Sequence, residues 1–352
     1  ELLELYKEKK NTRETLKIYQ DILKRNPNNI RASMELGYYY YSDGKVALAD
    51  EIFIKLGQRS IAEFEVIVLV IQLYLDKKKY DEGIVILQGM LKAVPDSPEI
   101  NHVAGIAFYG KKDNPAALKY FMKVTAESRF YEDAVIHASY ILSENKQNEE
   151  AIQLLRDAIE NEPQNAEFKY YLGTFYEDSE QFDKAAEFIK AAIELDQDNP
   201  RYHFRLGVVY DKWNRKEDSM ATMRKVIELD PKHANSLNYL GYTYADLGTN
   251  LDEAEQLIKE ALKYKPNDGY ITDSLGWVYY KKGEFEKAVQ YLQKAVQMVP
   301  DDPIMLEHLG DAYLKLNDKA KAPKYYKKSL KNKEKDKEEL EKKIRSISSD
   351  GS

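Results

Sequence analysis

Side chains that could carry out chemistry are scattered along this 352-residue chain rather than grouped. The sequence has no cysteine, so it offers no disulfide, thiolate ligand or cysteine nucleophile. Its histidines form no local pair with metal-ligand spacing; they are His102, His137, His203, His233 and His308. No glycine-rich phosphate loop or nucleophile elbow occurs. The sequence therefore predicts no enzyme activity, no metal site and no cofactor.

Charge narrows the class of partner. The formal net charge is -7, and acids and bases are mixed through most of the sequence. Binding to phosphates needs a basic stripe, so nucleic acid is not an expected partner. Adjacent acids such as Glu177 and Asp178 have the spacing of a solvated helix surface and give poor evidence for acid-base catalysis.

The elements that would position side chains are clearest in residues 269–302. Two amphipathic helical patterns follow one another there, separated by residues 281–283 and closed by Pro300, which cannot continue a helix. Gly276 in the first pattern and Ala288 in the second are small enough to let two helix backbones approach closely. The stretch therefore predicts a helical hairpin.

The same pattern recurs nine times with a period of 34 residues, and once of 35 because the turn at residues 247–251 is enlarged. The units start at residues 30, 64, 98, 132, 166, 200, 234, 269 and 303. We call the two helices of a unit helix A and helix B, and number positions from the unit's first residue. Position 20 is small in every unit: Ala49, Gly83, Ala117, Ala151, Ala185, Ser219, Ala254, Ala288 and Ala322.

This pattern resembles the tetratricopeptide repeat (TPR) family, whose signature places these residue types in a period of 34. The resemblance implies an all-α fold, a right-handed superhelical α-solenoid of helix-turn-helix units in which each unit contacts only its neighbours. Residues 1–29 would form a partial N-terminal unit whose other half we expect upstream. Residues 30–336 would form the nine full units, and residues 337–352 a C-terminal capping helix and tail. The implied function is a non-catalytic scaffold or adaptor that binds proteins or peptide segments.

In the family, helix A lines a concave groove through positions 2, 5, 9 and 12, with positions 6 and 13 nearby. Carried onto this chain residue by residue, these positions hold many aromatic and acidic side chains that the packing signature does not use. We therefore predict a protein-binding groove that includes Tyr170, Tyr171, Phe204, Arg205, Tyr239, Tyr242, Asp246, Asp273, Trp277 and Tyr280. Exposed aromatic anchors with a polar rim are typical of such surfaces. The alternative is that these tyrosines pack adjacent helix A segments together.

Trp277 is the predicted centre of this groove. Tyr242 and Trp277 both occupy position 9, and Tyr280 lies one turn beyond Trp277 on the same helix face. Asp246 and Asp273 flank this strip and would favour a partner with a basic residue next to an apolar one. Because position 9 is expected to face the groove, Trp277→Ala should weaken binding with little loss of stability.

Helix A of the unit at residue 64 is apolar nearly all round, with the sequence FEVIVLVIQLYL. Burial between the flanking units would explain this composition. The alternative is a self-association surface at Val68, Leu69 and Leu75, which would make the protein a homo-oligomer and a self-assembling structural protein.

Residues 237–283, with the enlarged turn and the motif DSLGW, look like a group of bacterial TPR proteins, many of them outer-membrane lipoproteins facing the periplasm. One of these delivers substrates to a carboxyl-terminal processing protease, which implies an alternative function as such an adaptor. Their lipidated cysteine is absent here. The longest apolar run, residues 66–71, is too short to cross a bilayer, so no transmembrane segment is expected. Periplasm and cytoplasm both remain open.

Overall fold

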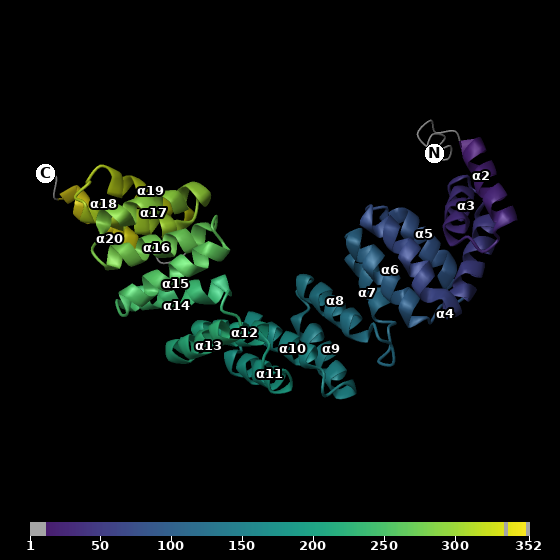
Figure 1. Cartoon of the computed structure of the whole chain (residues 1–352), viewed down its shortest axis with the longest axis horizontal. Coiled ribbons are helices and arrows are strands. Elements are labelled where there is room, and N and C mark those ends of the chain that lie inside the picture. The colour runs from purple at the N-terminus through teal and green to yellow at the C-terminus, as the bar shows by residue number, and fades with distance from the viewer. Residues whose placement is uncertain (1–11, 334–336, 350–352) are drawn as a thin grey trace. The chain divides into compact units, whose positions relative to one another are not determined.

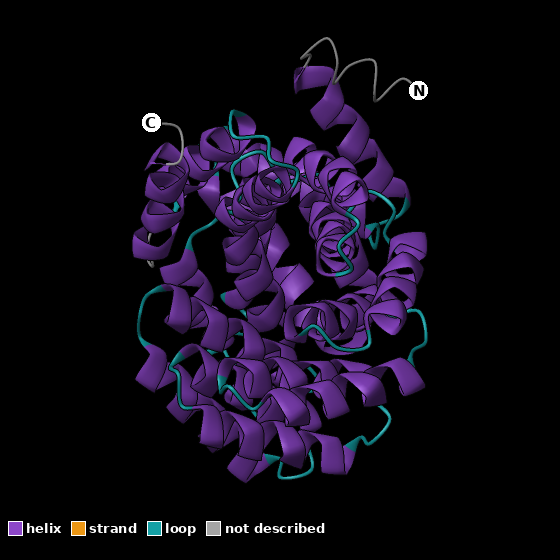
Figure 2. Ribbon diagram, turned by 90° about the vertical axis from the view of Figure 1, so that its left-hand side faces the viewer, coloured by secondary structure: helices purple, strands orange, loops and turns teal. Residues whose placement is uncertain are grey.

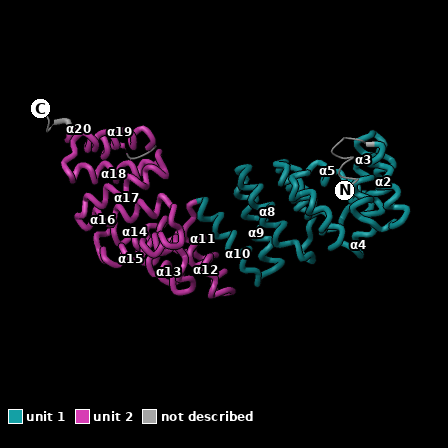
Figure 3. The backbone as a smooth tube through the Cα atoms, turned by 45° about the horizontal axis from the view of Figure 1, so that its top comes forward, with its two compact units in different colours: residues 1–179 teal, residues 180–352 magenta. Residues whose placement is uncertain are grey.

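The computed structural model describes residues 12–333 and 337–349, and every regular element in these ranges is an α-helix (Figures 1 and 2). Consecutive helices form hairpins, as the sequence predicts, so the all-α helix-turn-helix fold is confirmed. The chain divides into two compact parts, each made of several repeats: residues 1–179 and residues 180–352 (Figure 3). We call these parts unit 1 and unit 2, with a number, to distinguish them from the repeat units, which are named by their first residue.

Unit 1 contains helices α2 to α10. Their bounds are α2 Thr12–Arg25, α3 Ile30–Ser42, α4 Val46–Asp76, α5 Tyr80–Leu91, α6 Pro98–Gly110, α7 Asn114–Phe121, α8 Tyr131–Glu144, α9 Asn148–Asn161 and α10 Ala166–Asp178. Unit 2 contains helices α11 to α20. Their bounds are α11 Phe182–Leu195, α12 Pro200–Lys212, α13 Lys216–Leu229, α14 Ala234–Leu247, α15 Leu251–Tyr264, α16 Gly269–Lys281, α17 Phe285–Met298, α18 Pro303–Lys315, α19 Lys321–Asn332 and α20 Lys337–Ser349.

Local chemistry fixes where most helix A segments begin. A polar side chain just before the helix accepts a hydrogen bond from a free backbone N–H of the first turn, which is the usual N-cap. These caps are Asn29, Ser97, Asn165, Asn199, Asp268 and Asp302. Pro98, Pro200 and Pro303 follow as the first helical residues, where proline's missing N–H carries no penalty.

The helix crossings explain the small residues of the repeat. Ala288 of α17 is completely buried, and a Cβ atom added to Gly276 of α16 would lie 2.6 Å from the Leu292 side chain. A larger residue at either position would push the two helices of this hairpin apart, because no space remains between them. The small residues are therefore a packing requirement.

Helix α4 departs from the predicted pattern. Helix B of the unit at residue 30 and helix A of the unit at residue 64 run on as one 31-residue helix, interrupted only at Glu63, whose φ of -121° and ψ of 29° are not helical. Ile61 stands where proline closes several other units. Isoleucine keeps its backbone N–H and so permits the helix to continue, and the chain kinks at Glu63 without forming a loop.

Neighbouring hairpins are also joined by polar contacts that recur at one spacing. A helix B side chain donates a hydrogen bond to the hydroxyl of a tyrosine 20 residues later, in helix A of the next repeat. The pairs are Arg156 with Tyr176 in unit 1, and Arg224 with Tyr244 and Gln293 with Tyr313 in unit 2. These tyrosines therefore pack in the core and bond across the repeat boundary.

Helix α20 covers the end of unit 2. Leu340 and Ile347 are buried in the same core cluster as Tyr326 of α19. Lys343 reaches α18, where its Nζ lies 3.0 Å from Glu307 Oε1 and 2.9 Å from Asp311 Oδ1. The last helix is thus held by apolar burial and by a lysine placed between two carboxylates.

Candidate protein-binding surfaces

The predicted groove centre in unit 2 is a buried cluster. The Trp277 ring of α16 stacks on the Tyr280 ring, with centroids 4.6 Å apart, and on the His308 ring of α18, with centroids 4.1 Å apart. His308 Nδ1 lies 2.8 Å from Asp273 Oδ2, and both side chains are buried. The cluster therefore ties α16 to α18.

The structure corrects the expectation that Trp277 is an exposed anchor. Its side chain is 9% exposed, because His308, at position 6 of the next repeat, covers the ring. Asp273 is buried by the same contact and does not flank an open strip. Position 9 meets the neighbouring helix A here, so removing the tryptophan must damage packing.

Several other predicted groove residues also pack between helices. Tyr170 is buried in unit 1, and the half-buried Tyr171 makes an edge contact with Tyr140 of α8, with centroids 5.6 Å apart. In unit 2, the half-buried Tyr239 accepts a hydrogen bond from the Ser219 hydroxyl at 2.9 Å. The Phe204 ring lies against the His233 ring, with centroids 4.9 Å apart.

The residues that remain at the surface of this predicted groove are few. Tyr242 is half-buried, and burial, with the nearby Asp246 and Asp273 charges adding, raises its pKa to about 12. Tyr280 and Arg205 are half-buried, and Asp246 is exposed. In unit 2 the predicted set therefore splits into packing residues and four residues that keep some exposure, Tyr242, Tyr280, Arg205 and Asp246.

A broader apolar surface lies in unit 1, on the second half of α4. Val66, Leu69 and Leu73 are 55%, 65% and 47% exposed, and their spacing of three and four residues places them on one helix face. We call these three residues the aliphatic stripe. Monomeric proteins seldom leave large aliphatic side chains exposed in a row, so this face is a candidate contact surface.

The stripe revises the predicted self-association residues. Leu69 is exposed as expected, but Val68 is half-buried and Leu75 is buried beside Gly83 of α5. Leu75 belongs to the face of α4 that packs on the core, together with Ile67 and Ile71. The exposed apolar residues are therefore Val66 and Leu73 in place of Val68 and Leu75.

Two hollows flank the stripe. The α4–α6 hollow, of about 420 Å³, is lined mainly by apolar side chains, among them Phe64, Val68, Ile106 and Phe130. The α3–α4 hollow, of about 230 Å³, is lined by Val70, Leu73 and Tyr74 and carries the charged groups Arg31, Glu35, Lys77 and Lys79. A segment lying on the stripe could place side chains into both.

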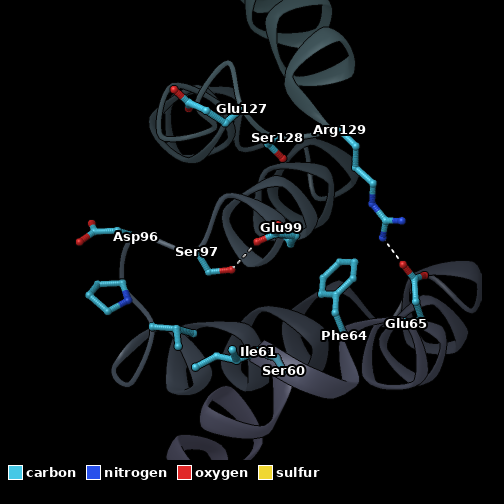
Figure 4. A pocket seen from close by; sticks show the side chains of 12 residues that line it. Ser60, Ile61, Phe64, Glu65, Asp96, Ser97, Glu99, Glu127, Ser128 and Arg129 are labelled. Carbon is cyan, nitrogen blue, oxygen red and sulfur yellow. Dashed lines mark hydrogen bonds and ion pairs between the residues drawn. The ribbon is translucent and has the colours of Figure 1, made fainter.

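A third hollow, of about 740 Å³, opens at the kink of α4 (Figure 4). We call it the kink hollow. Ile61 and Phe64 form part of its apolar lining. Arg129 pairs with Glu65 and lies over the Phe64 ring, 5.7 Å from its centroid. Its other charged lining groups are all acids, namely Asp96, Glu99 and Glu127. The kink hollow shares Phe64, Glu65 and Arg129 with the α4–α6 hollow, so the two are neighbours.

An ion-pair cluster that the sequence did not reveal ties α6 to α8. His102 Nε2 and His137 Nδ1 lie 2.5 Å and 3.3 Å from Asp133 Oδ2. Burial favours the neutral acid at Asp133, but hydrogen bonds from both histidines outweigh burial and hold the pKa of Asp133 far below its ordinary value. The hydrogen bond to Asp133 raises the pKa of His137. His102 occupies position 5 of its repeat and Asp133 occupies position 2 of the next. A histidine and an aspartate at these two positions are the sequence signal that could have predicted this pair.

We expect the stability of unit 1 to depend on pH through this cluster. A histidine with a raised folded-state pKa stabilises fully below its unfolded value of about 6.5, and this stabilisation is lost as pH rises through the folded value. An aspartate with a lowered pKa stabilises above about 3.9, and this is lost as pH falls. Stability should therefore be greatest between about pH 4 and 6.5.

Urea unfolding at a series of pH values would measure this, with Asp133→Asn expected to flatten the profile. Glu149→Gln, at an exposed acid on α9, serves as the control and should leave the profile unchanged. Identical profiles for Asp133→Asn and the unchanged chain would contradict the assignment.

Helical hairpins stacked on one another, with a small residue at each crossing, define a helical-repeat protein. Family models described as tetratricopeptide repeats match residues 142–205, 200–233, 222–256 and 274–337. The chain belongs to the tetratricopeptide repeat family, which confirms the resemblance drawn from its sequence. Proteins built from these repeats typically act as non-catalytic scaffolds for protein interaction.

Three similar proteins illustrate the match. A TPR repeat-containing protein of Pseudomonas aeruginosa, PA4667, is 47% identical over 58 residues, which is 16% of this chain and 10% of that protein. The crystal structure of a TPR protein from Parabacteroides merdae has a TM-score of 0.55 at 15% identity, over 72% of this chain and 99% of that one. YrrB, described as a TPR protein with an unusual peptide-binding site, has a TM-score of 0.43 at 24% identity, over 53% and 95%.

Among residues 12–333 and 337–349, no helix is long and apolar enough to cross a membrane. In the same ranges, no group of three or more histidine or carboxylate side chains is arranged to hold a metal ion.

Proposed function

We propose that this protein is a non-catalytic scaffold or adaptor that holds segments of partner proteins on the helix A faces of its repeats. The aliphatic stripe of α4 carries this proposal, because it presents three exposed aliphatic side chains between two hollows. Burying a fully exposed side chain of this kind contributes about 1.5–3 kcal/mol, so covering these roughly half-exposed side chains would contribute about 1 kcal/mol each. The residues Tyr242, Tyr280, Arg205 and Asp246, which keep some exposure in unit 2, would offer further contacts.

The test is a matched pair of variants. Leu69→Glu places a charge in the centre of the stripe, and Leu247→Glu does the same at an exposed leucine at the end of α14. Partners captured by the intact chain are identified by mass spectrometry, purified, and titrated against both variants. We expect Leu69→Glu to weaken binding about thirtyfold, the loss typical of an interface anchor, and Leu247→Glu to bind as the unchanged chain does. Partners that bind both variants equally well would disprove the role of the stripe.

Self-assembly is a second candidate, and the same exposed stripe favours it. Sedimentation over a range of concentrations separates the two functions. An oligomer that Leu69→Glu dissociates would show that a second copy covers the stripe, whereas a monomer at high concentration would remove self-assembly. Delivery of substrates to a periplasmic protease is a further alternative, supported only by residues 237–283.

A further inference from the structure

The charges around the aliphatic stripe are arranged with a direction. Beside the start of this half of α4, the kink hollow is lined by four carboxylates, Glu65, Asp96, Glu99 and Glu127, and one base, Arg129. Beside the end of α4, the α3–α4 hollow is lined by three bases, Arg31, Lys77 and Lys79, and one acid, Glu35. The apolar stripe therefore runs from an acidic end to a basic end.

Several of these charges already have partners, which leaves a smaller set to act on a ligand. Glu65 pairs with Arg129, Glu99 accepts a hydrogen bond from Ser97 at 3.0 Å, and Lys79 pairs with Glu82 at 3.4 Å. Asp96 and Lys77 are exposed at opposite ends. The ends keep their opposite signs after these pairs are counted.

The length between the ends indicates the size of the occupant. Glu65 and Lys77 are twelve residues apart on the helix, which corresponds to about 18 Å. The stripe has the spacing of one face of a helix, and a partner helix packs its own ridge of side chains beside such a face. A helix of about three to four turns would cover the stripe and reach both charged ends.

We propose that the segment held by unit 1 is an amphipathic α-helix with acidic residues in its first turn and basic residues in its last turn, lying antiparallel to α4. This rests on the proposed function and names the chemistry of its partner. Antiparallel packing places the basic last turn at the acidic kink hollow and the acidic first turn beside Lys77. The same distribution of charge stabilises the partner helix itself, because acids favour a helix N-terminus and bases a C-terminus.

A free helix has fewer neighbours to accommodate on this surface than α4 of a second copy would have. The occupant must extend side chains into hollows on both sides of α4, one bounded by α3 and the other by α6. In a second copy, α4 is itself flanked by α3 and α6, which would meet the same helices of the first copy. A slender segment has no such neighbours.

The experiment uses the full chain and two fluorescent peptides of about fourteen residues. Both carry leucine at the fourth, seventh and eleventh positions and lysine in the last turn. The first has glutamate in its first turn, and the second has lysine there. Affinities are measured by fluorescence anisotropy at low salt for the unchanged chain, Lys77→Glu, Leu69→Glu and Lys232→Glu.

We expect the unchanged chain to bind the first peptide and Lys77→Glu to bind it about fivefold to tenfold more weakly, since an attraction becomes a repulsion at a partly exposed site. The second peptide should recover the lost affinity on Lys77→Glu. Lys232→Glu, a change at an exposed lysine of unit 2, should bind as the unchanged chain does. Added salt should reduce the difference between the peptides.

Three results would overturn the inference. If Lys77→Glu and the unchanged chain bind both peptides equally, the charged ends do not select the partner. If neither peptide binds the unchanged chain, the occupant is not such a helix. If Leu69→Glu dissociates a dimer of the chain, a second copy covers the stripe. The proposed function fails separately, when natural partners bind Leu69→Glu at full affinity.

Discussion

Replacing Trp277 by alanine is expected to lower the free energy of unfolding of unit 2 by about 3–5 kcal/mol, the usual loss for a large aromatic side chain removed from a core. The ring is 9% exposed and stacks on both Tyr280 and His308. Its removal would open a cavity between α16 and α18. It would also take away the ring that covers His308 and Asp273, which are buried beside it.

Denaturant unfolding, combined with hydrogen exchange of the amides in α16 and α18, would measure this loss. Exchange is needed because repeat proteins can unfold in parts. The control is Tyr270→Ala on the same helix, where the side chain is 59% exposed and the expected change is within about 0.5 kcal/mol. If Trp277→Ala unfolds at the same denaturant concentration as the unchanged chain, the ring does not hold these helices together.

Two glycines of unit 1 are expected to respond to alanine in opposite directions. A Cβ atom at Gly57 of α4 would collide with the backbone carbonyl oxygen of Met90 in α5, and would lie 3.0 Å from the Met90 Cα. Backbone atoms cannot rotate away, so α4 and α5 must separate. We expect Gly57→Ala to cost about 1–3 kcal/mol, as overpacking usually does.

The matched control is Gly83→Ala in α5. A Cβ atom there would meet only the end of the Leu75 side chain, at 3.2 Å, and that end can shift. Alanine is the better helix former by about 1 kcal/mol, so Gly83→Ala is expected to be neutral or stabilising. Urea unfolding of both variants tests the pair. Equal destabilisation by the two changes would show that the α4–α5 crossing is not limited by the Met90 backbone.

The sequence by itself determined the hairpins, because they depend on interactions within one helix or between the two helices of one hairpin. Asn165 and Asp268 cap helices through hydrogen bonds to N–H groups two or three residues away. Small residues, such as Ala288 and Gly276, are required where the two helices of a hairpin cross. Such signals repeat in the sequence at the period of the structure. Helix α4 continues past its expected end where Ile61 stands in place of the usual proline.

The tertiary structure alone decided which side chains of helix A remain available to a partner. Whether position 9 faces solvent depends on the next helix A, and His308 covers Trp277 across 31 residues of sequence, although the sequence pattern placed Trp277 at the surface. In the same way, the packing of α5 buries Leu75 while Leu73 stays exposed two residues away. His102 and Asp133 meet only because the fold brings α6 and α8 within reach of these two side chains. Contacts between repeats join residues far apart in the sequence, so helical periodicity cannot show which residue of a face the neighbour covers.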